Sequence, residues 1–520
     1  MFDILICGAL IVDGSGSEGY IGDVGVEGGK ISAVGRLGGA AAVEVIEAEG
    51  RCLTPGFIDI HRHADAALFR HDWGRAELAQ GLTTIINGNC GLSLAPVCGA
   101  HAVEIQRYLS PIVGELPEGR EFPSMASYLA QAREAAPPVN TFMLAGMGTI
   151  RACAAGFSDL PLTAEQYARV HRLMEESLAG GAIGVSLGLG YAPECFYDTE
   201  GLIRALEPLR GSSTVVTVHM RQEGDGVVDA LREMLAVARE LRMPLEISHL
   251  KAIGRRNWRK SVPEMLRLID EARQDGLDIM CDVYPYPAGS TQLIHVLPPE
   301  YQAGGTEALT AALLDPLTRE RMRERMETGS DFENISLLVG FENIRATSLH
   351  RPENLEFEGR SIAEIAASKG SSDFDALFDL LASEHCAVSM IDFIADEEDI
   401  CDILRAPFSG VISDATYPAS GLLHPRVYGT YPRLFERYVL GKGVLSLPEA
   451  VRKVTRQPAD RFGLRTKGRI EPGADADLCL FDPSALRERD SYEHPETLAT
   501  GMDYVLVGGR PAIAEARFTF

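Results

Sequence analysis

The sequence predicts an α/β fold in which most of the 520 residues form a (β/α)8 TIM-type barrel. Eight short apolar runs each end in a polar or glycine-rich tip, and helical patterns separate several of them. Continuous apolar runs of this length are typical of parallel strands buried on both faces. The runner-up, an open doubly wound sheet, is disfavoured because no glycine-rich dinucleotide motif follows the first run. The runs are 57–60, 83–86, 141–144, 182–185, 215–218, 245–247, 278–283 and 410–412.

Helix signals occupy several of the intervals between these runs. Thr163 and Gln166 have the spacing of a capping box, and apolar residues then follow at helical spacing until Gly180 and Gly181 end the pattern. Residues 227–241 and 263–272 have the same character. The alternation of strands and helices favours the barrel.

Both ends of the chain have a different, strand-like pattern. A hairpin is expected at Gly28-Gly29. We expect residues 1–54 and 468–520 to form the two parts of a small β-sandwich domain, with the barrel spanning 55–467. Residues from about 292 to 405 are too many for one barrel crossover, so they predict an inserted subdomain beside the carboxyl-terminal mouth.

Composition narrows the range of partners. The net charge of −25 disfavours binding to nucleic acid or to an anionic membrane surface. We find no membrane-length apolar run and no secretion signal, and the 10 cysteines form no CxxC pairs. These features predict a cytoplasmic protein with reduced thiols that acts on a small molecule, and they leave the oligomeric state open.

Residues that commonly bind metals recur at the predicted carboxyl-terminal strand tips. His61 and His63 are two residues apart, so both imidazoles can face the same side of a strand. Each residue also has an ordinary structural explanation, such as a buried lone cysteine or an aspartate that caps a turn. Their coincidence at the rim where barrel active sites lie favours a site for a borderline-soft metal ion. The residues are His61, His63, Cys90, His219, His249 and Asp414.

Longer motifs span nearly the whole chain. They are PGFIDIHRHAD, QGLTTIINGNCGLSLAP, GVSLGLGYAP, VHMRQEGD, ISHLKAIGRRNW, DVYPYPAGST, ISDAT, HPRVYGTYPR and GADADLCLFDP. In this order they resemble the N-acyl-D-amino-acid deacylase (D-aminoacylase) family of the amidohydrolase superfamily. The NCG and YPYPAGST segments distinguish this family from hydantoinases and dihydroorotases.

The resemblance implies hydrolysis of N-acyl-D-amino acids to a carboxylate and a free D-amino acid, with one or two Zn²⁺ ions per chain. His61 and His63 would hold the more buried metal and His219 and His249 the other. Cys90 would occupy the bridging position. The preference for the D form rests wholly on the resemblance.

The same resemblance implies roles for the groups around the metal. Asp414 would be both a metal ligand and the catalytic acid/base. Lys251, Tyr284, Ser290 and Arg426 would hold the substrate carboxylate and the carbonyl oxygen. Charge-assisted hydrogen bonds from lysine and arginine suit such a carboxylate.

Some positions depart from the family pattern. Arg62, Met147 and Leu187 stand where family members commonly have HTH, GHG and STG, and they suggest an altered substrate range. We expect residues of the insertion, His295 among them, to influence which side chain is accepted. Two alternatives stay open: a cyclic-amide hydrolase of the hydantoinase type, which Cys90 disfavours, and a non-catalytic scaffold, which should have lost its ligands.

Overall fold

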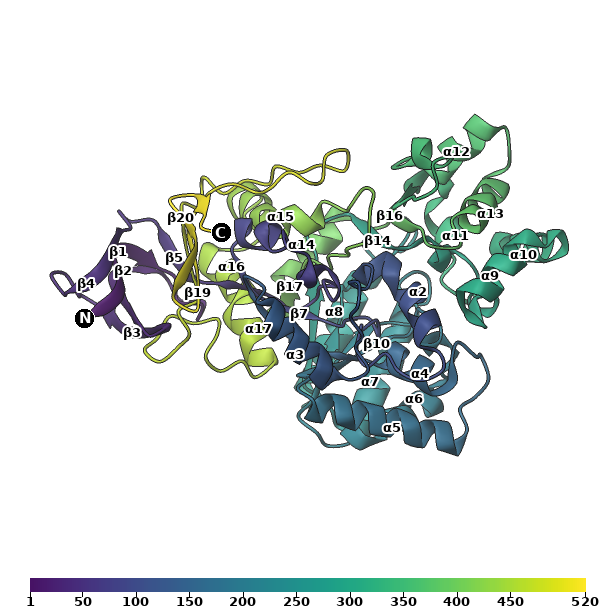
Figure 1. The fold of residues 1–520 in the computed structure, drawn as a ribbon, viewed down its shortest axis with the longest axis horizontal. Helices are drawn as coiled ribbons and strands as arrows, with labels where there is room; N and C mark the ends of the chain where they lie inside the picture. Colours follow the sequence, from purple (N-terminus) through teal and green to yellow (C-terminus); the bar gives the residue numbers. More distant parts are fainter.

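The computed structural model describes residues 1–520 (Figure 1). Its centre consists of parallel strands, and each apolar run predicted from the sequence overlaps one of them. One sheet has the order β17-β13-β12-β11-β10-β9, and a second has the order β6-β7-β8. These strands are β6 (Phe57–Asp59), β7 (Leu82–Asn87), β8 (Asn140–Met143), β9 (Ala145–Gly146), β10 (Gly184–Gly188), β11 (Val215–His219), β12 (Leu245–Ile247), β13 (Ile279–Val283) and β17 (Ser409–Val411).

The two parallel sheets are joined at both of their edges. On one side only Leu144 separates β8 from β9, so a single run of chain belongs to both sheets. On the other side, Arg62 beyond β6 forms a parallel bridge with Ala415 beyond β17. The amide of Asp414 also donates to the carbonyl of His61 at 2.9 Å. The first and last parallel strands therefore lie next to each other at their carboxyl ends.

Helices cover the outside of the parallel strands. The predicted capping box is formed: the Thr163 hydroxyl accepts from the Gln166 amide, and the Gln166 side chain accepts from the Thr163 amide. The helix that follows buries Tyr167, Val170 and Met174. The helices of this layer are α1 (Arg75–Ala79), α2 (Ala102–Val113), α3 (Met125–Ala135), α4 (Met147–Ala155), α5 (Ala164–Ala179), α6 (Thr199–Ala205), α7 (Val227–Leu241), α8 (Ser261–Gln274), α14 (Glu397–Arg405), α15 (Arg426–Arg433), α16 (Leu447–Val454) and α17 (Arg456–Arg461). None of the helices is long and apolar enough to cross a membrane.

Strands from both chain ends combine into one sheet, seen as purple and yellow strands side by side (Figure 1). The junction is the antiparallel pair formed by β5 and β18. The predicted hairpin is present, since Glu27 pairs with Lys30 across Gly28 and Gly29, whose φ values are +58° and +77°. The strands are β1 (Phe2–Ile11), β2 (Tyr20–Glu27), β3 (Lys30–Gly35), β4 (Ala42–Glu47), β5 (Cys52–Pro55), β18 (Leu478–Phe481), β19 (Met502–Val507), β20 (Arg510–Ala514) and β21 (Arg517–Phe518).

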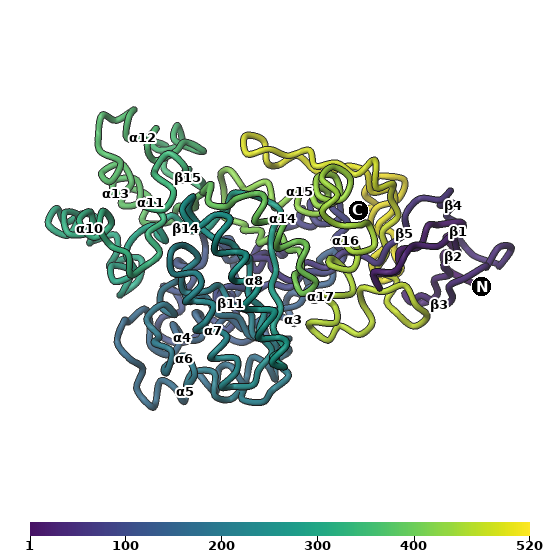
Figure 2. The backbone as a smooth tube through the Cα atoms, turned by 180° about the vertical axis from the view of Figure 1, so that it is seen from behind, coloured from purple at the N-terminus to yellow at the C-terminus, as the bar shows by residue number.

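A separate substructure lies between β13 and β17, at the end of the molecule opposite the terminal sheet (Figures 1 and 2). Its core is an antiparallel sheet in the order β14-β16-β15. The chain then returns to the parallel strands through α14, which packs on α8, β13 and β17. The elements are β14 (Ala288–Gln292), α9 (Gly305–Leu314), α10 (Pro316–Thr328), α11 (Ile335–Val339), β15 (Ile344–Thr347), α12 (Ile362–Lys369), α13 (Asp373–Ser383) and β16 (Ser389–Phe393).

Candidate metal centre and active site

The structure brings the six candidate ligands together at the carboxyl ends of the parallel strands. Each follows or ends a different strand, except for the His61 and His63 pair beyond β6. All six are buried, although they come from segments as far apart in the sequence as β6 and β17. They form two groups, one of His61, His63, Cys90 and Asp414 and one of Cys90, His219 and His249.

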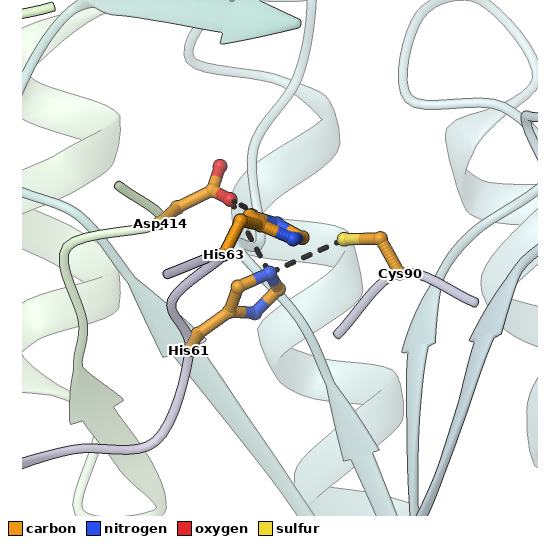
Figure 3. A group of neighbouring side chains, drawn as sticks. All are labelled: His61, His63, Cys90 and Asp414. Carbon is orange, nitrogen blue, oxygen red and sulfur yellow. Dashed lines mark hydrogen bonds and ion pairs between the residues drawn. The ribbon is translucent and has the colours of Figure 1, made fainter. Parts of the chain in front are cut away.

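The first group has four ligand atoms within 4.8 Å of one another. His61 Nε2 lies 3.2 Å from Cys90 Sγ and 3.2 Å from Asp414 Oδ1 (Figure 3). His63 Nε2 lies 3.3 Å from the same carboxylate oxygen. Two imidazole nitrogens, a thiol sulfur and a carboxylate oxygen form a donor set that zinc prefers.

The second group shares Cys90 with the first. Cys90 Sγ lies 3.5 Å from His249 Nε2, and His249 Nε2 lies 3.0 Å from His219 Nδ1. The three ligand atoms are again within 4.8 Å of one another. Because Cys90 belongs to both groups, its sulfur lies between two places where a cation would find several donors.

Three of these residues have an unusual backbone conformation. Cys90, His249 and Asp414 adopt positive φ values of +54°, +38° and +53°. A left-handed conformation costs a residue other than glycine about 1–3 kcal/mol, and such residues cluster at functional sites. The backbone therefore holds these side chains in positions that an ordinary turn would not give them.

The surroundings control the charges of the candidate ligands. Burial alone would raise the pKa of Asp414, but the Arg426 guanidinium at 2.9 Å and His61 hold it well below its ordinary value. Burial lowers the pKa values of His61, His219 and His249. The imidazoles are consequently neutral, which is the form that binds metals, and the aspartate is ionised.

Glu223 is a residue of the candidate site that the sequence analysis missed. Its carboxylate lies 2.9 Å from His249 Nδ1 and 2.6 Å from Lys251 Nζ. A carboxylate behind a ligating histidine fixes the orientation of the ring and its tautomer. The available signal was its position in the motif VHMRQEGD, four residues after His219.

The predicted substrate-binding residues line the same cavity as five of the six candidate metal ligands, and His61 is the one that does not line it. Arg426 Nη2 donates to the carbonyl of Ser290 at 2.8 Å, and its guanidinium lies over the Tyr284 ring at 4.9 Å. Lys251 Nζ is 5.8 Å from the centre of the same ring. The four predicted substrate-binding residues therefore line one part of the cavity, where Arg426 contacts Asp414.

The residues that depart from the family pattern lie outside this cavity. Arg62, Met147 and Leu187 are buried, and none of them lines the cavity. Arg62 points away from it and forms ion pairs with Glu77 at 2.8 Å and Asp59 at 3.2 Å. Side chains alternate along an extended segment, so Arg62 faces away from its neighbours His61 and His63. The structure thus does not support a direct effect of these departures on substrate range.

A family profile described as "Amidohydrolase family" matches residues 44–286 and 412–513. The matched residues include all six candidate ligands, and the gap between the two segments corresponds to the antiparallel substructure and the elements around it. The fold and the site together define the class, and the chain belongs to the amidohydrolase family.

Three relatives identify the branch of that family. A D-aminoacylase from Alcaligenes xylosoxydans xylosoxydans is 34% identical, covering 100% of this chain and 96% of its own. An N-acyl-D-aspartate deacylase from the same organism is 32% identical, over 98% and 91% of the two chains. The crystal structure of the Bordetella bronchiseptica N-acyl-D-glutamate deacylase, complexed with zinc and a phosphonate mimic of the tetrahedral intermediate, superposes with a TM-score of 0.84. It is 30% identical and covers 99% of this chain and 98% of its own. These relatives place the chain in the D-aminoacylase branch.

Proposed function

We propose that this protein hydrolyses N-acyl-D-amino acids, releasing a carboxylate and a free D-amino acid. The observation that carries the proposal is the placement of the His, Cys and Asp donors beside Lys251 and Arg426 in one cavity. Such a cavity combines metal ligands with cations that suit a substrate carboxylate. The relatives are named for N-acyl-D-amino acids, which supports the D configuration.

The donor set fits one or two Zn²⁺ ions. His61, His63, Cys90 and Asp414 would hold one ion, and His219 and His249 would hold a second with Cys90 as the shared ligand. A bound zinc ion lowers the pKa of water from 15.7 to about 7 and polarises a carbonyl group. Zinc in the Bordetella bronchiseptica relative supports this choice of metal.

The residues of this chain then move protons and hold the substrate. The Asp414 carboxylate, kept ionised by Arg426, accepts the proton of the attacking water as the new carbon–oxygen bond forms. It returns that proton to the nitrogen when the carbon–nitrogen bond breaks. Tyr284 can donate a hydrogen bond to the carbonyl oxygen, and Lys251, Ser290 and Arg426 orient the substrate carboxylate.

We also propose the finer architecture of the chain and its location in the cell. The bridge between the β6 and β17 segments supports a closed (β/α)8 barrel over residues 55–467. A separate core of 16 apolar residues supports a small sandwich-like domain made of 1–54 and 468–520, with an insertion at about 292–405. Ten free cysteines support a cytoplasmic location.

A stereospecific assay tests the proposed function. Zinc-loaded protein is incubated with paired N-acetyl-D and N-acetyl-L amino acids, and the release of free amine is measured. We expect release from the D series only. Equal release from both series would contradict the stereochemistry, and no release from either would contradict the substrate class and direct the search to cyclic amides.

A further inference from the structure

Two carboxyl groups in the cavity take no part in the proposed reaction. Glu333 is 6% exposed, and one of its oxygens accepts from the Glu223 amide at 2.5 Å. Its other oxygen, Oε1, has no hydrogen-bond partner, and the side chain lines the cavity. The nearest basic atom is His295 Nε2 at 3.8 Å, which also has no hydrogen-bond partner. A buried carboxylate oxygen without a partner is costly unless a ligand supplies a donor.

Asp392 is the second of these groups. It lies opposite Gly289 in the antiparallel sheet and lines the same cavity. Burial raises its pKa to about 6, and the nearby Lys251, His295 and Arg426 act in the opposite direction. At neutral pH the side chain is therefore largely a carboxylate, and it takes part in none of the ion pairs of the cavity.

The basic residues of the cavity are already paired with other carboxylates. Lys251 lies 2.6 Å from Glu223, and Arg426 lies 2.9 Å from Asp414. The lining contains these two permanent cations against four carboxyl groups, so Glu333 and Asp392 are left without a lysine or arginine partner. Cys90 and Asp414 would serve a zinc ion rather than a substrate cation, because they belong to its candidate ligand set.

Aliphatic side chains lie next to the two free carboxyl groups. Ile335 follows Glu333 by two residues, and Ile394 follows Asp392 by two residues. Ile253 packs in the same small cluster as Ile394, and all three isoleucines line the cavity. An apolar wall that ends at carboxylates matches a side chain that has an aliphatic stem and a positively charged end.

We propose that Glu333, assisted by Asp392, selects N-acyl-D-amino acids whose side chain ends in a cation, as in lysine or arginine. The inference rests on the proposed function and adds the substrate class. An acidic side chain would enter beside two unpaired carboxylates with no uncommitted lysine or arginine to receive it. The chain would then differ in selectivity from the relatives named for N-acyl-D-aspartate and N-acyl-D-glutamate.

A substrate panel tests this selectivity on the zinc-loaded, full-length protein. The substrates are the Nα-acetyl derivatives of D-lysine, D-arginine, D-methionine and D-glutamate, and kcat/KM is measured by amine release. We expect D-lysine and D-arginine to exceed the neutral, unbranched D-methionine by at least about tenfold. We expect D-glutamate to be the poorest substrate.

Two variants connect the preference to the carboxyl groups. Glu333→Gln keeps an acceptor for the Glu223 amide but removes the charge. Asp392→Asn removes the charge at the second position and keeps the size of the side chain. Each should lower the D-lysine to D-methionine ratio of kcat/KM, by about tenfold for Glu333→Gln, mainly through the KM for D-lysine. The control is Glu300→Gln, which removes an exposed carboxylate of the insertion that pairs with Arg325 and should leave the ratio unchanged.

The outcomes separate this inference from the proposed function. Turnover of D-methionine with no gain for D-lysine, a preference for D-glutamate, or a ratio that neither variant changes would overturn the inference alone. Absence of turnover with every D substrate would overturn the proposed function and the inference with it. Melting curves of the variants show whether a lowered ratio comes from a folded protein.

Discussion

The charge of Asp414 is set by its neighbours rather than by its own chemistry. Burial disfavours a carboxylate, but Arg426 and His61 stabilise it more strongly, and its pKa falls well below the ordinary value. The positive φ of +53° aims this side chain at the histidines. A single residue thus combines the position of a candidate metal ligand with the charge that a general base needs.

Replacing Asp414 by Asn tests this double role. The amide keeps the size and an oxygen atom but cannot accept the proton, so we expect kcat to fall by about 10²–10⁴-fold. Zinc content, measured by mass spectrometry, should stay nearly intact. The matched control is Asp225→Asn, which removes a partly exposed carboxylate paired with Arg256 and should keep full activity. An active Asp414→Asn enzyme would exclude the assigned role.

A buried network of ion pairs and hydrogen bonds connects three segments behind the candidate site. Arg62 beyond β6 pairs with Glu77 in α1, and the hydroxyl of Tyr417, beyond β17, donates to Glu77 at 2.5 Å. Asp59 in β6 joins the network through Arg62 and accepts from the His61 amide at 3.2 Å. The network therefore supports the backbone that carries the candidate ligands His61 and His63.

Removal of the Glu77 carboxylate tests how much this network contributes to the stability of the fold. Glu77→Ala leaves a fully buried guanidinium with an incomplete set of partners, and we expect a loss of about 3–5 kcal/mol in the free energy of unfolding. The control is Glu271→Ala, which breaks an exposed pair with Arg267 on α8 and should cost at most about 1 kcal/mol. Urea unfolding followed by circular dichroism measures both. Similar losses in the two variants would show that the buried network contributes no more to stability than an exposed ion pair does.

The buried acid Glu194 makes the stability of the whole molecule depend on pH. Glu194 is 1% exposed, and burial raises its pKa from 4.5 to about 8, although the Gly188 amide at 2.9 Å lowers it in part. The folded state therefore holds this proton more tightly than the unfolded state. The resulting stabilisation is complete below about pH 4.5 and is lost as the pH rises through about 8.

The variant Glu194→Gln mimics the protonated acid and should remove this dependence. Between pH 5 and pH 8 the native protein should lose more stability than the variant, by on the order of 1–3 kcal/mol. Melting temperatures measured across this range give the comparison. Glu200→Gln, an exposed neighbour in α6, is the control and should behave like the native protein. Parallel pH profiles for the native protein and Glu194→Gln would contradict the expected protonation.

Local patterns were sufficient for much of the secondary structure and for the candidate ligands. The apolar runs predicted the parallel strands, and Thr163 with Gln166 predicted the start of a helix, because periodicity and capping depend on residues close together in the chain. His61 and His63 could be assigned to one face for the same reason. The motifs extended this to the amidohydrolase family, which the comparisons confirm.

Which groups face one another across the cavity depends on how distant segments pack. Glu223 had only its place in the motif VHMRQEGD as a signal, and its contacts with His249 and Lys251 appear only in the folded chain. Glu333 has no local signal, because its unpaired buried oxygen is a property of the packing around it. Arg62 was predicted to alter the substrate range, but its side chain pairs with Glu77 and does not line the cavity. The strands, the family and the candidate ligands could be predicted from the sequence, because these depend on local spacing and motif order. The charge balance and selectivity of the site depend on desolvation and on pairing across the fold, which no local pattern contains.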